Sequence, residues 1–458
     1  MWTVVFPKKL YDDLNEFLFS TTDENGCFLL ANTFNGNKRV VLVTEVIRPD
    51  EESWNHSGEH SLEPSSAFIN KCVVLADSKN LSPIFVHTHP HSMHPAGFSY
   101  IDEKSNKRMF ANVSQILPDN PLGSFVFSRH GMCGVVFNDG KIQNVSKIKI
   151  SGKTLNWYNG VGFNGKVDSV QPKFDRQVRV LGEQNQKKLQ NLTITLVGAG
   201  GTGSPLAVQL ARMGVKRLRI VDKDIIDETN LPRIYGAKES DVGKPKVDVV
   251  KKHIECFSKT KVEAIQADIT KDDIVSELVD SDVIFSCTDN LASRAILNDV
   301  SVQYLIPLID VGCRIHKDKD GISQAIVKVQ VITPDTACLW CNGTLDAKMI
   351  MQESLSEEER RKLAEEGYHE NIDKQPSIIS MTTMAASMAV NKLLNLLGVF
   401  GQEYDSQTQI ELKDGFLISS TPEIKNGCVC QKRRGLGMKR RIITPQNSQD
   451  KSDGDLNR

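Results

Sequence analysis

The segment LTITLVGAGGTGSPLAVQLARMGVKRLRIVD, residues 192–222, indicates the fold of the larger part of this chain. Its apolar, β-branched start predicts a buried strand that stops at a glycine-rich turn, and helical spacing follows from Ser204 to Met213. Residues 218–221 predict a second strand, which ends at Asp222. Glycines let the backbone approach a phosphate, the helix offers free N–H groups, and a carboxylate at the second strand accepts ribose hydroxyls. The predicted nucleotide-binding residues are Gly198, Gly200, Gly201, Gly203 and Asp222.

The composition is that of an ordinary globular protein. The 458 residues are 40% hydrophobic and 25% charged, enough for about three domains of usual size. The formal net charge of −1 gives no electrostatic reason to expect nucleic acid or an anionic membrane surface as a partner. The N-terminal stretch lacks a secretion signal, and no apolar window is long enough to cross a bilayer. We therefore expect a cytoplasmic protein without a membrane partner.

Two histidines mark a candidate metal site in the first 150 residues, where we expect a helix over 8–20 and strands over 27–31 and 40–47. His87 and His89 lie two residues apart in a predicted strand, so both point to one face. Ser99 and Asp102 follow, where a helix is predicted to begin. Two imidazoles and one carboxylate leave a fourth zinc position for water, which is the arrangement of a hydrolytic zinc site.

The order HxHP, a short loop and SxxD resembles the JAB/MPN metalloproteases over roughly the first 140 residues. The resemblance implies that His87, His89 and Asp102 bind a catalytic zinc and that Ser99 stabilises the oxyanion. It also implies a glutamate that accepts the proton of the attacking water. Glu24 stands where the family places this base, and Glu45 is the alternative. His91 and His94, in the loop, are expected to bind no metal.

Polar residues beyond Asp222 indicate a site for a triphosphate. They are Asp224, Asn230, Arg233 and Lys246. A further strand over 283–286 leads to Asp289 at its carboxyl end, where open α/β sheets bind ligands, and this carboxylate suits magnesium.

The motifs DRQ, GxGGxG, DxD, NLxR, GxPK and CTDN, followed by paired cysteines, resemble the ThiF-type adenylyltransferases, from about Phe174 to Cys430. This superfamily includes ubiquitin-activating enzymes and the activators of sulfur carriers. The resemblance implies ATP and Mg²⁺ as cofactors, with Asp222 on the ribose, Asn230, Arg233 and Lys246 on the phosphates, and Asp289 on the metal. Arg176 resembles an arginine that reaches ATP from the other subunit, which implies a homodimer. Lys244 is expected on the surface, and for Arg294 a structural ion pair and an active-site role stay open.

The chemistry implied is attack of a carboxylate on the α-phosphorus of ATP, usually by the C-terminal glycine of a ubiquitin-like protein. Pyrophosphate leaves and an acyl adenylate remains. Cations must offset the charge that moves onto the leaving phosphates, which is the role implied for Arg233, Lys246 and Arg176.

Four cysteines form two pairs, Cys338 with Cys341 and Cys428 with Cys430, and provide enough thiolates for a closed structural zinc site. The second pair is CxC, where the family more often has CxxC. From 342 to 427 there is no cysteine, although thioester-forming members carry their nucleophile there. We therefore expect adenylation without an enzyme thioester, and Cys313 is the alternative nucleophile.

The sequence thus predicts an α/β protein. An N-terminal JAB/MPN α/β metallopeptidase domain (1–150) is followed by a linker (151–171), a Rossmann-like ThiF-type adenylation domain with a structural zinc (172–430) and a disordered tail (431–458). Between the cysteine pairs, a capping box over 356–359, a charged helix to 366 and a packed helix over 378–397 are expected. The predicted function is adenylation of a ubiquitin-like or sulfur-carrier protein, coupled to a peptidase that trims or releases it. The alternatives are sulfur transfer and a non-catalytic docking protein.

Overall fold

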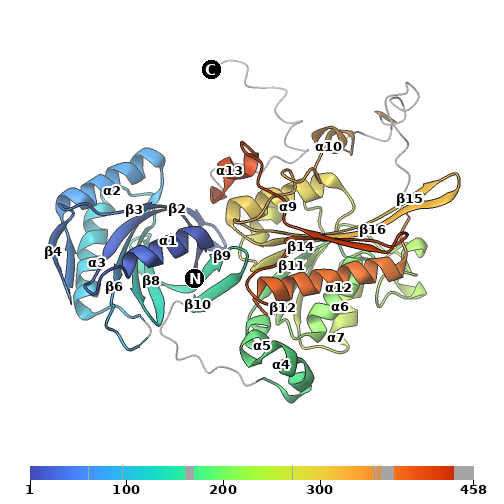
Figure 1. Ribbon diagram of the computed structural model, residues 1–458, viewed down its shortest axis with the longest axis horizontal. Helices are drawn as coiled ribbons and strands as arrows, with labels where there is room; N and C mark the ends of the chain where they lie inside the picture. The colour runs from blue at the N-terminus through green and yellow to red at the C-terminus, as the bar shows by residue number, and fades with distance from the viewer. Residues whose placement is uncertain are drawn as a thin grey trace. The chain divides into compact units, whose positions relative to one another are not determined.

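The computed structural model describes residues 1–59, 61–94, 96–159, 170–270, 272–353, 355, 358–359, 362 and 376–437. The chain divides into two compact units, one built mainly on Met1–Val167 and one on the residues from 168 onward (Figure 1). No helix within the described residues is long and apolar enough to cross a membrane.

The first unit is organised around one large sheet, whose strand order is β1-β3-β2-β6-β7-β8-β9-β10. Its strands are β1 (Trp2–Pro7), β2 (Gly26–Asn35), β3 (Arg39–Ile47), β6 (Ser82–Thr88), β7 (Leu122–Ser128), β8 (Gly131–Asn138), β9 (Lys141–Ser151) and β10 (Leu155–Asn159). The sheet closes on itself because β1 pairs in parallel with both β3 and β9. A separate hairpin is made of β4 (Trp54–Gly58) and β5 (Ser61–Pro64).

Three helices accompany this sheet, namely α1 (Lys8–Leu18), α2 (Ser66–Lys79) and α3 (Tyr100–Val113). Leu14 and Leu18 of α1 are fully buried against the strands, which explains why the first predicted helix forms. Every residue of β6 is buried, so the strand that carries His87 is a rigid central element. This rigidity fixes where the histidine side chain stands.

The sheet of the first unit extends past residue 150 through β10. This strand pairs antiparallel with β9, and its Leu155 is almost completely buried. The Lys147 ammonium lies over the Trp157 ring, which joins the two strands further. The run LNWYN is short and does not alternate strictly between apolar and polar residues, so it gives a weak strand pattern, yet the sheet continues to Asn159.

The second unit contains an eight-stranded sheet of order β13-β12-β11-β14-β15-β16-β17-β18. Its strands are β11 (Thr193–Val197), β12 (Arg217–Val221), β13 (Lys261–Ile265), β14 (Val283–Ser286), β15 (Leu308–Asp318), β16 (Gly321–Ile332), β17 (Gln407–Glu411) and β18 (Phe416–Ser420). Pairing is parallel from β13 to β15 and antiparallel from there to β18. The chain order reverses between β11 and β14, which is the point where such open sheets bind ligands.

The helices of this unit are α4 (Asp175–Leu181), α5 (Glu183–Gln190), α6 (Gly203–Arg212), α7 (Lys246–Glu255), α8 (Asp272–Leu278), α9 (Leu291–Tyr304), α10 (Ala347–Glu353), α12 (Ile379–Leu396) and α13 (Val429–Arg433). Short 3-10 turns cover Pro172–Phe174, Glu228–Asn230 and Glu239–Asp241. Helices α6 and α12 lie on one side of the sheet and α9 on the other (Figure 1). The packed helix expected over 378–397 is confirmed by α12, whose small residues Ala385, Ala386 and Ala389 are fully buried.

Helix α13 runs from Val429 through Arg433 and so passes the expected domain end at Cys430 by three residues. The Arg433 guanidinium forms an ion pair with Asp299 of α9 at 2.7 Å. The rest of the expected tail, 438–458, lies outside the described residues, as do 160–169 of the linker. Most of the expected capping box and charged helix over 356–366 also lies outside them.

Candidate nucleotide and metal sites

The glycine turn joins β11 to α6, and two of its glycines are required by close backbone contacts. Gly198 has φ +99°, and a Cβ there would lie 2.5 Å from the carbonyl oxygen of Cys287. A Cβ on Gly203 would lie 1.8 Å from the carbonyl oxygen of Gly198. A Cβ on Gly200 would meet nothing within 4 Å, so space is open above this residue. The turn therefore combines a tight base with an open side that can receive a ligand.

Asp222 holds this turn in place. Its carboxylate accepts hydrogen bonds from the backbone N–H of Ala199 at 2.6 Å and of Asp224 at 2.9 Å. Burial raises the pKa of Asp222, and these two bonds together with nearby Lys246 oppose the rise. The sequence indicated a ribose contact for Asp222. The structure adds a role in shaping the loop, which pattern alone does not show.

A backbone pairing brings Lys246 to the same edge of the sheet. Ile225 and Pro245 form an isolated bridge, and the N–H of Ile226 donates to the carbonyl oxygen of Lys244. The Lys246 ammonium consequently lies 2.7 Å from the carboxylate of Asp224. Lys244 instead pairs with Asp241 on the surface, in agreement with the surface position expected for it.

Asn230 and Arg233 both lie in the segment between β12 and α7, and Arg233 contacts the glycine turn. Asn230 is buried, its Nδ2 donates to Asp227, and its Oδ1 has no hydrogen-bond partner among the described residues. A buried unsatisfied oxygen is costly unless a ligand or ion completes it. The alkyl chain of Arg233 lies over Gly201, where a Cβ would come within 3.0 Å of Cδ. Arg233 thus lies beside the predicted phosphate site.

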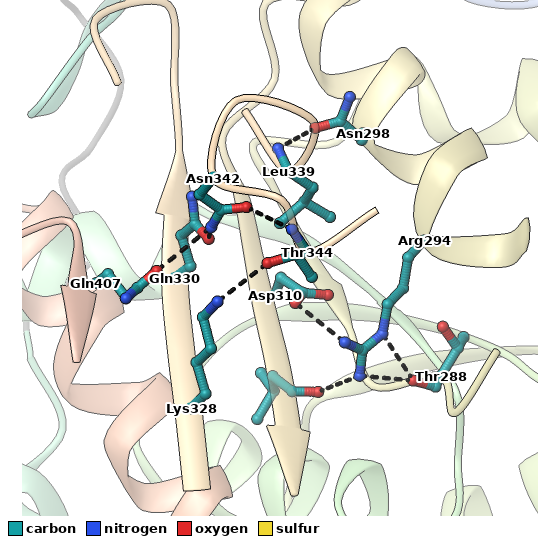
Figure 2. A network of polar contacts seen from close by, with 11 residues as sticks. Thr288, Arg294, Asn298, Asp310, Lys328, Gln330, Leu339, Asn342, Thr344 and Gln407 are labelled. Atoms are coloured by element: carbon teal, nitrogen blue, oxygen red, sulfur yellow. Dashed lines mark hydrogen bonds and ion pairs between the residues drawn. The ribbon is translucent and has the colours of Figure 1, made fainter. Parts of the chain in front are cut away.

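Asp289 is exposed just after β14, and Arg294 supports the loop before it. The Nε and Nη2 atoms of Arg294 donate to the carbonyl oxygen of Thr288, and Nη2 also donates to that of Val311 (Figure 2). Its Nη1 lies 3.5 Å from the buried carboxylate of Asp310. Of the two roles left open for Arg294, these contacts favour a structural one.

Arg176 is exposed on α4, and its expected reach into another subunit stays a prediction. Of the ten cysteines, all in the described part of the chain, Cys256 alone is exposed. Burial raises the pKa of the Cys313 thiol to about 11, which disfavours the thiolate that a nucleophile requires.

The cysteine cluster, made of Cys338, Cys341, Cys428 and Cys430, brings all four sulfur atoms together. Three sulfur–sulfur distances are 3.7 Å, from Cys338 to Cys341 and Cys428 and from Cys341 to Cys430. Zinc–sulfur bonds of about 2.3 Å in a tetrahedron place sulfurs about 3.8 Å apart. Although the second pair is CxC, both of its thiols reach the cluster, because Cys428 directly precedes α13 and Cys430 lies in its first turn. The four donors therefore fit a structural zinc.

The metal triad, made of His87, His89 and Asp102, lies in the first unit, with its donor atoms within 4.8 Å of one another. His87 Nε2 is 3.1 Å and His89 Nε2 is 3.4 Å from Asp102 oxygens. Neither ring nitrogen of the buried His87 makes a hydrogen bond of good geometry within the described residues, so the imidazole fits a metal ligand. Ser99 and Asp102 form the capping box that begins α3, which confirms the helix start expected there and aims the carboxylate at the histidines.

Electrostatics act differently on the two kinds of donor in the triad. Burial raises the pKa of Asp102, but its contacts with His87 and His89 and its bond from Ser99 outweigh this and hold the pKa well below its usual range. Asp102 is therefore ionised, as a zinc ligand must be. The hydrogen bond with Asp102 raises the pKa of His89, which favours the protonated imidazole, so a zinc ion must displace that proton in order to bind.

Glu24 is the carboxylate nearest the triad among the two considered. Its Oε1 lies 3.9 Å from Nε2 of His89, whereas Glu45, on β3, forms an ion pair with Lys79 at the end of α2. The N–H of Glu24 donates to Gly58 of β4, a hairpin that the sequence did not predict. His91 contacts Thr22 and His94 contacts Ser92, and neither belongs to the triad.

The second unit matches the ThiF family model over residues 174–429, and the chain belongs to the ThiF family. Among its relatives, the adenylyltransferase and sulfurtransferase MOCS3 of Anopheles gambiae is 36% identical over 140 residues, which are 30% of this chain and 32% of that protein. The SAMP-activating enzyme E1 of Haloferax volcanii is 33% identical over 130 residues, 28% of this chain and 48% of that protein.

These matches thus span about a third to a half of the relatives' own length. Among solved structures, the microcin C7 biosynthetic enzyme MccB in complex with N-formylated MccA aligns with a TM-score of 0.47 and 16% identity. That alignment covers 88% of this chain and 99% of MccB.

Proposed function

We propose that the second unit adenylates the C-terminal carboxylate of a ubiquitin-like or sulfur-carrier protein, using ATP and Mg²⁺. The observation that carries the proposal is the gathering of the glycine turn, Asp222 and Lys246 at the carboxyl edge of a ThiF-family sheet. Relatives named as a sulfurtransferase and as a SAMP-activating enzyme support the class of partner.

The residues of the proposed site bind the nucleotide and neutralise the charge of its phosphates. Lys246 and Arg233 supply cations for the phosphates, and Asp289 offers an exposed carboxylate to Mg²⁺. Magnesium, when bound, offsets charge on the leaving pyrophosphate. No side-chain nucleophile is needed, which agrees with the raised thiol pKa of the partly buried Cys313. Arg176 acts from a second copy in a homodimer.

The test pairs two glycine variants. Full-length protein is incubated with ATP, Mg²⁺ and small ubiquitin-like proteins, and intact-mass spectrometry measures an AMP increment on the partner. Gly200→Ala should fold normally, because its Cβ meets nothing, yet lose nucleotide binding, because the Cβ enters the space above the turn. Gly198→Ala should lower the melting temperature as well, because its Cβ overlaps Cys287. Full AMP transfer by Gly200→Ala would contradict the proposed site, and a reductant-sensitive enzyme adduct would show a thioester instead.

A second function is proposed for the first unit, a zinc peptidase of the JAB/MPN type that trims or releases the same partner. The triad supports it, because three protein donors leave one zinc position for water, and Glu24 lies beside His89. Zinc, when bound, would lower the pKa of that water. Glu24 would accept the proton and pass it to the leaving amine, and Ser99, at the start of α3, would donate to the oxyanion.

The division of labour is tested with partner precursors that carry a C-terminal extension. His89→Ala should stop cleavage and leave AMP transfer unchanged, whereas Lys246→Ala should do the reverse. Loss of both activities in either variant would contradict separate sites. A thiocarboxylate on the recovered partner would favour sulfur transfer over conjugation. Absence of both activities, of zinc and of ATP binding would favour a docking protein.

A further inference from the structure

Helix α9 begins next to the exposed Asp289, and its first turn is tied to that loop. Asn290 Oδ1 accepts the N–H of Ser293 at 2.7 Å, and the Arg294 guanidinium donates twice to the carbonyl oxygen of Thr288. The carbonyl of Thr288 belongs to the residue directly before Asp289. The loop conformation therefore depends on where α9 places Arg294.

The same helix is tied to the cysteine cluster one turn further along. Asn298, four residues after Arg294 and on the same helix face, accepts the N–H of Leu339 at 2.9 Å (Figure 2). Leu339 lies between Cys338 and Cys341. Asp299, the next residue, pairs with Arg433 of α13, the helix that carries Cys430. Both halves of the cluster are thus bonded to α9.

These links are buried and therefore costly to break. Asn298 is 2% exposed, and the side chains of Arg294 and Asp310 are 15% and 5% exposed. Removing one partner would leave a buried donor or acceptor unsatisfied, since little water can replace it. Each of these contacts therefore opposes movement of the part of α9 that it holds.

We propose that α9 couples the cysteine cluster to the Asp289 loop, with Asn298 and Arg294 as the positioning residues. Metal in the cluster fixes Leu339, Leu339 fixes α9 through Asn298, and Arg294 then holds the loop in the geometry that binds Mg²⁺ with the nucleotide. The inference rests on the proposed nucleotide site. Because such a coupling is reciprocal, Mg²⁺ with nucleotide must also tighten metal binding by the cysteines.

The experiment measures that reciprocal effect in the full-length chain loaded with cobalt(II), whose thiolate absorption reports the cysteine cluster and not the triad. A chelator selective for transition metals is titrated with and without Mg²⁺ and a non-hydrolysable ATP analogue. In the wild type, the nucleotide should raise cobalt affinity by about fivefold or more. Asn298→Ala and Arg294→Lys should abolish the increase, because alanine removes the acceptor and lysine lacks the guanidinium fork.

A matched control lies in the same polar network but off the helix. Lys328 of β16 donates to Thr344 at 3.0 Å, and Lys328→Gln should keep the nucleotide-induced increase. Substitution of a residue with only a structural role would lower cobalt affinity equally with and without nucleotide. Two results would overturn the coupling alone. One is a nucleotide-induced increase in cobalt affinity in Asn298→Ala that equals the wild-type increase. The other is the absence of this increase in a wild type that binds the analogue. A wild type that binds no analogue in calorimetry would overturn the proposed adenylation and the coupling together.

Discussion

The metal triad and the cysteine cluster differ in how far protein atoms enclose the metal position. The cluster offers four donors, and Cys338, Cys341 and Cys430 are buried. The triad offers three donors, of which His89 and Asp102 are partly exposed. A closed tetrahedral set suits a structural metal, and an open set with a carboxylate nearby suits a hydrolytic one. Donor number, exposure and donor type all differ between the two sets, each in the direction expected of a structural site and of a hydrolytic site.

The largest expected effect tests whether the cluster is structural. Cys430→Ser removes one of four thiolates, and zinc binding contributes about 10–16 kcal/mol to folding in small zinc domains. We expect loss of one zinc per chain and a strongly lowered melting temperature of the second unit, measured by metal analysis and calorimetry. His89→Ala should also lose one zinc but change the melting temperature little. Equal destabilisation by both variants would contradict the difference proposed between a structural cysteine cluster and a triad that does not stabilise the fold.

The next prediction tests whether the triad is catalytic. Glu24→Gln keeps the side-chain shape but cannot accept a proton, so peptide cleavage should fall roughly 100- to 10,000-fold. Zinc content should stay unchanged, because Glu24 is not a ligand. Glu45→Gln is the control, since Glu45 pairs with Lys79 and should leave cleavage near normal. A greater loss of cleavage activity in Glu45→Gln than in Glu24→Gln would indicate that Glu45 is the general base.

A third prediction concerns the nucleotide site. Lys246→Ala removes a cation from the phosphate region, so exchange of pyrophosphate into ATP should fall roughly 100- to 1,000-fold. Lys244→Ala is the matched control two residues away, because Lys244 pairs with Asp241 on the surface. Equal losses in the two variants would contradict the assignment of Lys246.

The smallest effect is a pH dependence in the zinc-free protein. The folded-state pKa of His89 is raised by Asp102. Protonated His89 therefore contributes to the free energy of unfolding, and this contribution is fully present below the unfolded-state pKa of about 6.5. The contribution is lost as pH rises through the raised folded pKa. Melting temperatures should therefore fall over that range relative to His89→Gln, and zinc should reverse the trend because it displaces the proton. Parallel curves for both proteins without zinc would contradict the pKa shift.

Much of the local structure could be predicted because it depends on neighbouring residues. The strand–turn–helix–strand order from Leu192 to Asp222 is confirmed by β11, α6 and β12. The helix start at Ser99 follows from a capping box of residues three apart. By contrast, β10 and the β4–β5 hairpin were missed, because their stability comes from pairing partners or packing and not from a strong pattern.

Sequence alone predicts the ThiF-type nucleotide fold, the spacing of the candidate metal ligands and the grouping of four cysteines in two pairs, because periodicity, glycine content and short spacings are local properties. The folded structure is needed to show which carboxylate approaches His89, how Asp222 holds the glycine turn and that Arg294 binds backbone carbonyls. It also decided that one helix contacts both the Asp289 loop and the cysteine cluster. These contacts join residues far apart in the chain, and only the packing of the folded chain specifies them.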